Sequence, residues 1–308
     1  MSLYSLFKSN GPGGFGHAST AWKVVEGISL AGHAILVTGC TSGIGRETAR
    51  VLAARGAHVI GTARTEADAR AACATFGVNA AGLACDLGEP ASVRACVAAV
   101  ARDHPPLDAI IGNAGIMALP SLSQAYGYER QFFTNHIGHF ILITGLAHRL
   151  SDQSRVVMVS SAAHQSAPAE GIEFDNLSGE RRYRPFTAYG QSKLANLLFA
   201  RELARRLAAG QTANAVHPGV IVTTNIIRYV RAPRVFMQVA ASVLTMLACK
   251  TIPQGATTQC FVAVHPGASG ISGEYFVDCA VAKTSSAGAD TGLARRLWEV
   301  SEQIVASV

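Results

Sequence analysis

Apolar runs of strand length alternate with segments of helical periodicity from residue 33 to the end of the chain. Strands are predicted at 33–37, 58–61, 81–85, 108–111, 155–160, 212–216 and 275–278. Helices are predicted at 44–54, 66–76, 89–102, 124–150, 187–208, 254–264 and 289–306, and an apolar helical region covers 223–249. Strands separated by helices in this way indicate βαβ units.

The predicted strands are apolar at consecutive positions rather than at alternate ones, as in a parallel sheet that is covered on both faces. Right-handed crossovers then place helices on both sides of the sheet. We therefore expect an α/β fold of one domain, a Rossmann, doubly wound parallel sheet with helices on both faces. No linker and no internal repeat divides the chain.

The composition supports a folded protein. The chain has 308 residues, of which 49% are hydrophobic and 15% charged. A disordered chain is excluded, because disorder requires few apolar groups and much charge. The net charge of +6 permits a small anionic partner, but it does not indicate nucleic-acid binding, and none is expected.

The cysteines indicate a reducing compartment. There are seven, an odd number, and no C-x-x-C pair occurs, which argues against a disulfide framework or a zinc site. Buried free thiols are the simpler interpretation. The N-terminus lacks the apolar core of a signal peptide, so we expect a cytoplasmic protein. His164, His217 and His265 lie near motifs, but none of them has a partner at metal-ligand spacing, and no metal is expected.

Two glycine-rich stretches compete as the phosphate-binding loop. Residues 11–16 formally match G-x-G-x-x-G, but no strand precedes them, and a flexible arm is the simpler interpretation. Residues 38–45, TGCTSGIG, lie between the first predicted strand and the first predicted helix. Glycines there let the backbone approach a pyrophosphate, and the helix N-terminus offers amides to it. A purely structural turn is the alternative.

The second loop resembles the cofactor loop T-G-x-x-x-G-x-G of the short-chain dehydrogenase/reductase family. Further motifs follow in that family's order: Asp86-Leu87, Asn113-Ala114-Gly115, Asn135 within FTNHIGHF, Ser160-Ser161, Tyr189 to Lys193, and Pro218 to Thr223. VSSAAH, AYGQSKLANLLFARELARRL and AVHPGV look closest to the retinol-dehydrogenase-like branch. GFGHASTAWKVVEGI is similar to the short-chain dehydrogenases of the chloroplast protein-import envelope.

The resemblance divides the chain into an N-terminal extension and one family domain. Residues 1–30 are expected to form the extension, with a short helix after Thr20. The short-chain dehydrogenase/reductase domain would cover residues 31–308. Its dinucleotide-binding half would span about 31–160 and its catalytic and substrate half about 161–308.

The resemblance also implies a catalytic set of Asn135, Ser161, Tyr189 and Lys193. Tyr189 would be the general acid/base, and Ser161 would donate a hydrogen bond to the reacting oxygen. Lys193 lies four residues after Tyr189, on the same helix face, where an ammonium is expected to lower the pKa of the phenol. Lys193 would also hold the nicotinamide ribose, and Asn135 would anchor a water of the proton relay. Ser160 is the rival of Ser161, which the usual family order favours.

The cofactor is expected to be NADP(H) rather than NAD(H). NAD-preferring folds place a carboxylate at the end of the second strand, but this chain has Arg64 there, and Arg46 follows the glycine loop. Arginines suit a 2′-phosphate, although both could instead be solvated surface residues. The cofactor-binding residues implied are Gly39, Thr41, Ser42, Gly43, Ile44, Gly45, Arg46, Arg64, Asp86, Leu87, Asn113, Ala114, Gly115, Tyr189, Lys193, Pro218, Gly219, Ile221 and Thr223.

The region after Thr223 usually forms the substrate lid in this family. Here Arg228, Arg231 and Arg234 precede an apolar stretch at 235–249. Our hypothesis is an apolar pocket for a small lipophilic carbonyl or alcohol. A plain core helix and a peripheral membrane contact, with the arginines facing anionic headgroups, stay open.

The chain departs from the shorter members of the family in two places. A long loop between Ser161 and Tyr189 carries basic residues at 181–184, which we interpret as a solvated face. This loop leaves open whether the protein is a homodimer or a monomer. Gly112 stands where the family often has asparagine before Asn-Ala-Gly, and only a small effect on sheet stability is expected.

The implied function is NADP(H)-dependent interconversion of a lipophilic ketone or aldehyde and its alcohol by hydride transfer. A non-catalytic, NADP-responsive interaction protein on the same fold is the alternative. Intact Tyr189 and Lys193 favour the enzyme. A nucleotide-sugar epimerase is disfavoured, because its usual loop, T-G-x-x-G-x-x-G, does not match.

Overall fold

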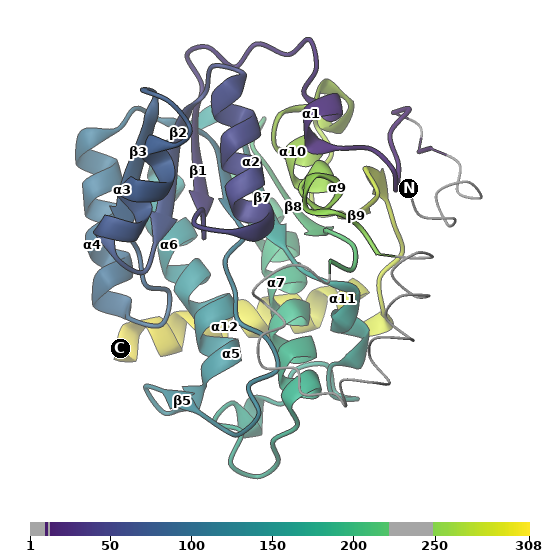
Figure 1. Ribbon diagram of the computed structural model, residues 1–308. Helices are drawn as coiled ribbons and strands as arrows, with labels where there is room; N and C mark the ends of the chain where they lie inside the picture. Colours follow the sequence, from purple (N-terminus) through teal and green to yellow (C-terminus); the bar gives the residue numbers. More distant parts are fainter. Residues whose placement is uncertain (1–9, 12, 222–248) are drawn as a thin grey trace, which may run out of the picture.

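An eight-stranded sheet forms the centre of the molecule (Figure 1). The computed structural model describes residues 10–11, 13–221 and 249–308. Within these residues the strand order is β10-β9-β8-β7-β4-β1-β2-β3, and only β10 runs antiparallel to its neighbour. The strands are β1 (Ala34–Thr38), β2 (His58–Ala63), β3 (Ala80–Ala84), β4 (Leu107–Gly112), β7 (Leu150–Val159), β8 (Thr212–His217), β9 (Tyr275–Val277) and β10 (Ala280–Val281).

The direction of winding reverses between β1 and β4. The strands β1 to β3 follow one another toward one edge, and β4 to β10 follow one another toward the other. Such a switch point leaves a crevice at the carboxyl ends of the strands. The predicted doubly wound parallel sheet is confirmed.

Helices cover both faces of the sheet (Figure 1). The buried apolar residues form two clusters, one on each face. Along β1, Ala34 and Leu36 belong to one cluster, whereas Ile35 and Val37 belong to the other, which explains why every position of this strand is apolar. The longer helices are α2 (Gly43–Ala54), α3 (Glu66–Ala74), α4 (Pro90–Asp103), α6 (Gly138–Leu146), α7 (Pro185–Arg206), α10 (Thr257–Val264) and α12 (Thr291–Ser307).

The helix predicted at 124–150 is wrong in its first part. A hairpin of β5 (Gln124–Ala125) and β6 (Tyr128–Glu129) occupies that part. Tyr126 and Gly127 both have positive φ, 54° and 80°, as a two-residue hairpin turn requires. The short α5 (Arg130–Phe132), a π-helical turn at Phe133–Ile137 and α6 then follow. Apolar periodicity does not reveal such a turn, because Tyr126 is not a typical residue for positive φ.

The segment before β1 contributes to the core. The short α1 (Ala21–Val24) begins after Thr20, as predicted, and Thr20 caps it by accepting a hydrogen bond from Lys23 N. Val24 is buried in the same cluster as α2 and α10. The glycine-rich stretch before α1 packs against the domain at Phe15, where we expected a flexible arm. The centre of the Phe15 ring lies 5.2 Å from the centre of the His265 ring.

The last helix, α12, lies across α7 (Figure 1). The ring of Trp298 stacks on Phe199 with a centroid distance of 5.7 Å and meets Phe140 edge-on at 4.9 Å. The guanidinium of Arg206 covers Trp298 at 4.3 Å. Consequently α12 buries apolar surface of both α6 and α7.

The remaining predicted elements that the structure describes are present, with smaller differences. The helix predicted at 254–264 is divided into α9 (Ile252–Gly255) and α10, and the short α11 (Ser286–Ala289) precedes α12. The strand predicted at 155–160 begins earlier, at Leu150. The predicted helical region at 223–249 lies outside the described residues except for its last position. Among the helices that are described, none has the length and apolar character to cross a bilayer.

Candidate active site

The carboxyl ends of the strands at the switch point open into a cleft of about 950 Å³. The motifs singled out from the sequence meet there, although they are spread from Gly39 to Ile221. The predicted residues that line the cleft are Gly39, Thr41, Ser42, Gly43, Ile44, Gly45, Arg46, Arg64, Asp86, Leu87, Asn113, Ala114, Gly115, Ser161, Tyr189, Lys193, Pro218, Gly219 and Ile221. Asn135 lies behind the cleft wall, and Thr223 lies outside the described residues.

The glycine loop leaves room for a phosphate. Gly39 and Gly43 have φ of 72° and 60°, a backbone conformation that side chains disfavour. A Cβ at Gly45 would lie 2.3 Å from Asn113 Nδ2. The side chain of Ser42 does not cap α2, so the first amides of that helix are available to an anion.

The loop after β4 closes the cleft from the other side. Asn113 donates from Nδ2 to the carbonyl of Thr38 at 2.8 Å. Its Oδ1 is buried and has no hydrogen-bond partner among the described residues, as expected of an acceptor that is completed by a ligand. Together with the glycine loop, this orphaned acceptor fits a dinucleotide.

The far end of the cleft carries both cations and an unpredicted carboxylate. Arg46 and Arg64 line it, and both are exposed. Arg46 also lies within 3.5 Å of Thr75 Oγ1. Asp68, in the first turn of α3, lines the same end and accepts a hydrogen bond from Thr65 at 2.7 Å. Sequence reasoning missed Asp68 because only the strand end was searched for a carboxylate.

Tyr189 lies on α7 and is almost fully buried, with an exposed fraction of 6%. Burial raises the pKa of its phenol, and a hydrogen bond with the Ser161 side chain lowers it in part. The expected lowering of this pKa by Lys193 is therefore not found. Desolvation dominates, since the ammonium stands 5.7 Å from the centre of the Tyr189 ring.

Lys193 is buried beneath Tyr189. Its Nζ donates to the carbonyl of Val159, at the end of β7, over 2.9 Å. Burial lowers the pKa of the ammonium to about 8, because the charged form loses its hydration. Nζ therefore carries its charge below this pH and stands beside Gly115, 3.5 Å from where a Cβ of that glycine would lie.

The two serines after β7 face different partners. The Ser160 hydroxyl is buried and donates to the carbonyl of Lys193 at 2.7 Å. The Ser161 side chain caps the following turn by accepting from Ala163 N at 3.1 Å, and it lies near enough to the Tyr189 phenol to lower the pKa of that phenol in part. Ser161 is therefore the serine that faces the cleft beside the phenol.

Asn135 occupies the π-helical turn and is fully buried. Its side chain holds the main chain of Ile116, accepting from N at 2.8 Å and donating to O at 2.9 Å. Nδ2 also donates to Ser192 Oγ at 2.9 Å. All polar atoms of this side chain are thus engaged within the protein, and any bound water of a relay would use other atoms.

Apolar side chains that sequence reasoning missed line the mouth of the cleft. Phe186 and Val220 are 55% and 54% exposed, and both line the cleft with Met117. Phe186 could have been found from the sequence, since it lies one helical turn before Tyr189 on the same helix. An apolar rim of this kind suits an apolar ligand.

Two described positions that flank the segment 222–248 lie side by side at this rim. Val220 and Cys249 form an isolated parallel bridge, and Lys250 N donates to Val220 O at 2.8 Å. The Lys250 ammonium forms a buried ion pair with Asp278 at 2.6 Å. Val220 is thereby held against residues 249–250, and Lys250 is paired with the turn between β9 and β10.

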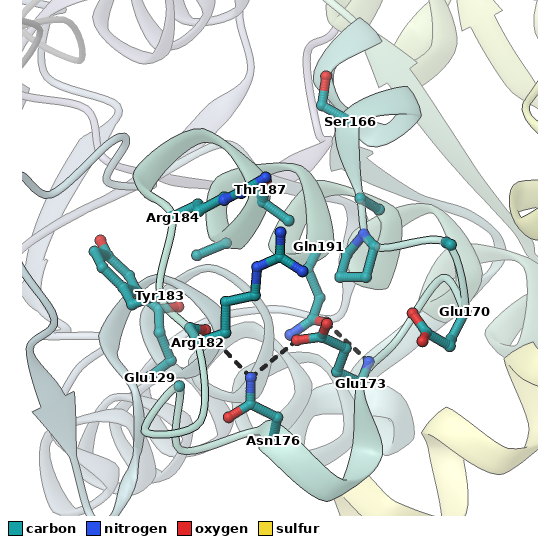
Figure 2. A pocket seen from close by; sticks show the side chains of 15 residues that line it. Glu129, Ser166, Glu170, Glu173, Asn176, Arg182, Tyr183, Arg184, Thr187 and Gln191 are labelled. Carbon is teal, nitrogen blue, oxygen red and sulfur yellow. Dashed lines mark hydrogen bonds between the residues drawn. The ribbon is translucent and has the colours of Figure 1, made fainter.

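A second cavity, of about 330 Å³, lies against other positions of α7 and is polar (Figure 2). Asn176 donates there to Glu173 and to the Arg182 carbonyl, at 2.9 and 3.2 Å. None of the predicted catalytic or cofactor residues lines it. The neighbouring Arg181 pairs with Asp175 at the surface, as expected of a solvated face.

The comparisons with known proteins agree with this geometry. The profile of the short chain dehydrogenase family matches residues 33–234. Short-chain dehydrogenase TIC 32 B, chloroplastic, of Brassica napus is 40% identical, over 100% of both chains. Retinol dehydrogenase 14 of Homo sapiens is 37% identical, over 90% of this chain and 87% of that protein.

Solved structures show the same fold. A putative uncharacterized protein from Mycobacterium paratuberculosis superposes with a TM-score of 0.74 and 32% identity, over 93% of this chain and 98% of that one. A short chain dehydrogenase from Burkholderia cenocepacia, in complex with NADP, superposes with a TM-score of 0.64 and 26% identity, over 80% and 96%.

These observations define the class. The chain belongs to the short-chain dehydrogenase family and is an NAD(P)-dependent oxidoreductase of that family. Within it, the chain resembles the retinol dehydrogenases and the TIC 32 proteins.

Proposed function

We propose that this protein interconverts a lipophilic ketone or aldehyde and its alcohol with NADP(H), and that Tyr189 acts as the general acid/base. One observation supports this most strongly. The side chains of Ser161 and Tyr189 both line the open cleft, Ser161 lowers the pKa of the phenol in part, and the buried Lys193 ammonium lies 5.7 Å from the centre of the Tyr189 ring. Two hydroxyl groups side by side suit one developing oxyanion.

The protonation states suit reduction. Burial raises the pKa of Tyr189, so the phenol keeps its proton at neutral pH and can give it to a carbonyl oxygen. Ser161 would donate to the same oxygen, where charge develops. Lys193, with a pKa of about 8, keeps a positive charge near the phenol and stabilises the phenolate that remains. The nicotinamide, when bound, supplies or accepts the hydride.

Preference for NADP(H) rests on the exposed arginines of the cleft. Arg46 and Arg64 lie at the end of the cleft beyond the glycine loop, where a 2′-phosphate would be accommodated. Asp68 is the opposing charge at this end, but the Thr65 hydroxyl already occupies its Oδ2. The balance of two cations and one carboxylate favours the phosphorylated ribose.

A lipophilic substrate is supported by the apolar rim of Phe186, Val220 and Met117. The names of the retinol dehydrogenases among the relatives point in the same direction. Turnover of NADPH with retinoid, steroid, aliphatic and aromatic carbonyls would identify the class of substrate. A non-catalytic, NADP-responsive protein would bind NADPH in the same assay and oxidise none of it.

Replacement of Tyr189 tests the mechanism. We expect Tyr189→Phe to lower kcat by about 10²–10⁴-fold, because the proton donor is lost, and to leave NADPH binding intact. Tyr183→Phe is the matched control, since this tyrosine lines the second cavity and donates to Leu119 O. Unchanged turnover in Tyr189→Phe would refute the mechanism.

A further inference from the structure

A buried histidine joins two parts of the cleft wall. His139 belongs to α6, one residue after its start, and its side chain is fully buried. The ring atom Nε2 lies 2.9 Å from Thr38 Oγ1, at the end of β1. The other ring nitrogen, Nδ1, lies 2.8 Å from the carbonyl oxygen of Asn135, in the π-helical turn. One imidazole thus spans from the sheet to that turn.

The partners determine the tautomer of His139. A carbonyl oxygen only accepts, so Nδ1 carries the hydrogen that points at Asn135. Burial, with a smaller effect of the Lys193 charge, lowers the pKa of His139 to about 4, and the ring is neutral at physiological pH. Nε2 is therefore an acceptor, and the Thr38 hydroxyl donates to it. The competing acceptor, the carbonyl of Ile111, is farther away, at 3.5 Å.

Thr38 links His139 to the loop after β4 by further hydrogen bonds. Its Oγ1 accepts hydrogen bonds from the amides of Asn113 and Ala114, each at 2.9 Å. The hydroxyl thereby uses both lone pairs and its single hydrogen. Asn113 and Ala114 line the cleft, so the position of the cleft wall depends on the hydroxyl that His139 orients.

The connections form a closed ring around that loop. The Asn135 side chain hydrogen-bonds to N and O of Ile116. The His139 ring hydrogen-bonds to the Asn135 carbonyl. The Thr38 hydroxyl donates to His139 and accepts from the amide of Ala114. The loop is thus held at 113–114 by Thr38 and at 116 by Asn135. His139 is the member that fixes the distance between these two anchors, and Gly115 lies between them, beside Lys193.

Gly112 leaves space for the imidazole ring of His139. A Cβ there would lie 2.6 Å from Met158 Sδ and 3.2 Å from Cδ2 of His139. A side chain at 112 would meet Met158 first and the imidazole second, so glycine there leaves both side chains in place.

We propose that His139 is a positioning residue for the site, which holds the loop 113–116 and the π-helical turn 133–137 at the separation that cofactor binding needs. The proposal rests on the proposed function only in taking this cleft as the nicotinamide site. His139 itself touches neither the cleft nor the reacting atoms, and it acts through Thr38 and Asn135.

The test compares cofactor affinity and stability in matched variants. His139→Phe keeps a ring and removes both hydrogen bonds, and Thr38→Val removes the hydroxyl at constant shape. His136→Phe is the control, because His136 is equally buried, lies three residues away and bonds to Ser301 of α12 instead of the cleft wall. The Kd for NADPH is measured by fluorescence titration, and Tm by thermal unfolding.

We expect His139→Phe and Thr38→Val each to weaken NADPH binding about tenfold, and the double variant to be no weaker than the weaker single one. His136→Phe should lower Tm as much as His139→Phe and keep Kd within about twofold of the wild type. An unchanged Kd in His139→Phe, equal weakening in His136→Phe, or multiplying effects in the double variant would overturn the proposal.

Two further measurements keep the test decisive. Should His139→Phe not fold, Thr38→Val and Thr38→Ser are compared, and only the serine variant should retain wild-type affinity. Long-range ¹H–¹⁵N spectra of the wild type should show His139 as the neutral Nδ1–H tautomer at pH 6–8, and an imidazolium there would contradict the proposal.

The binding readout separates this proposal from the proposed function. A wild type that binds NADPH and reduces no carbonyl would contradict the reaction and leave the positioning role as measured. A wild type that binds neither NADPH nor NADH would contradict both.

Discussion

Burial shifts the two central side chains of the cleft toward their uncharged forms. It raises the pKa of Tyr189 and lowers that of Lys193 to about 8. The phenol is therefore ready to donate a proton at neutral pH, whereas its role as a base in alcohol oxidation requires more stabilisation of the phenolate. We infer that alcohol oxidation gains from rising pH more strongly than carbonyl reduction does.

The cofactor preference depends on one exposed arginine. We expect Arg64→Asp to weaken the binding of NADPH by about tenfold or more and the binding of NADH by less than about threefold. The reason is that only NADPH has a 2′-phosphate to pair with a guanidinium. Arg70→Asp is the control, because it makes the same change of charge at a residue of α3 that does not line the cleft. In the wild type Arg70 pairs with Glu66. Equal losses for both cofactors in Arg64→Asp would contradict the assignment.

The motif residues could be predicted from the sequence, because their spacing and order are visible in the chain itself and do not depend on knowing the fold. The glycine loop, Tyr189 and Lys193 were found in this way. Depth of burial could not be read, so the direction of the Tyr189 pKa shift was predicted wrongly. Asp68 and Phe186 were missed because they belong to no motif, and only the folded chain brings them to the cleft.

At the scale of the elements, periodicity predicted the sheet and its helices and failed where the backbone is irregular. The hairpin at β5 and β6 depends on positive φ at Tyr126 and Gly127. The π-helical turn at 133–137 has the apolar pattern of an ordinary helix, yet its wider winding places Asn135 against Ile116. Local conformations of this kind follow from tertiary contacts, which no pattern of apolar residues contains.

The helix α12 stabilises the pair α6 and α7, and Trp298 is its principal contact. We expect Trp298→Ala to lower the free energy of unfolding by about 3 kcal/mol, because a large buried aromatic side chain is lost. Urea denaturation followed by circular dichroism would measure this loss.

The chain provides its own control for this experiment. The other tryptophan, Trp22, is 45% exposed, and Trp22→Ala should cost less than about 1 kcal/mol. A Trp298→Ala variant as stable as Trp22→Ala would show that α12 is not needed to hold the core.

The whole molecule should lose stability in mild acid. Burial lowers the pKa of His136 to about 3 and of His139 to about 4, whereas unfolded histidine titrates near ~6.5. Below pH ~6.5 the unfolded chain binds protons that the folded chain does not, so stability falls as pH falls toward these folded values. Each histidine should cost roughly 2 kcal/mol between pH 7.5 and pH 5.

A variant isolates this effect from other titrating groups. Glu129 acts in the opposite sense, since burial raises its pKa and its protonation favours the folded chain in acid. In urea denaturation at both pH values, His136→Phe should therefore reduce the difference between them by roughly 2 kcal/mol. The same difference as in the wild type would show that His136 is protonated in the folded protein.

The bridge between Val220 and Cys249 has a consequence for evolution. Backbones so paired lie about 5 Å apart, so Val220 and Cys249 are neighbours in space although they are far apart in the sequence, and the Lys250–Asp278 ion pair lies next to this junction. The entropy of closing a loop depends only weakly on its length. An insertion or deletion between Val220 and Cys249 should therefore change the free energy of loop closure by little and leave this junction in place, so that length can vary at this point of the chain without cost to the sheet.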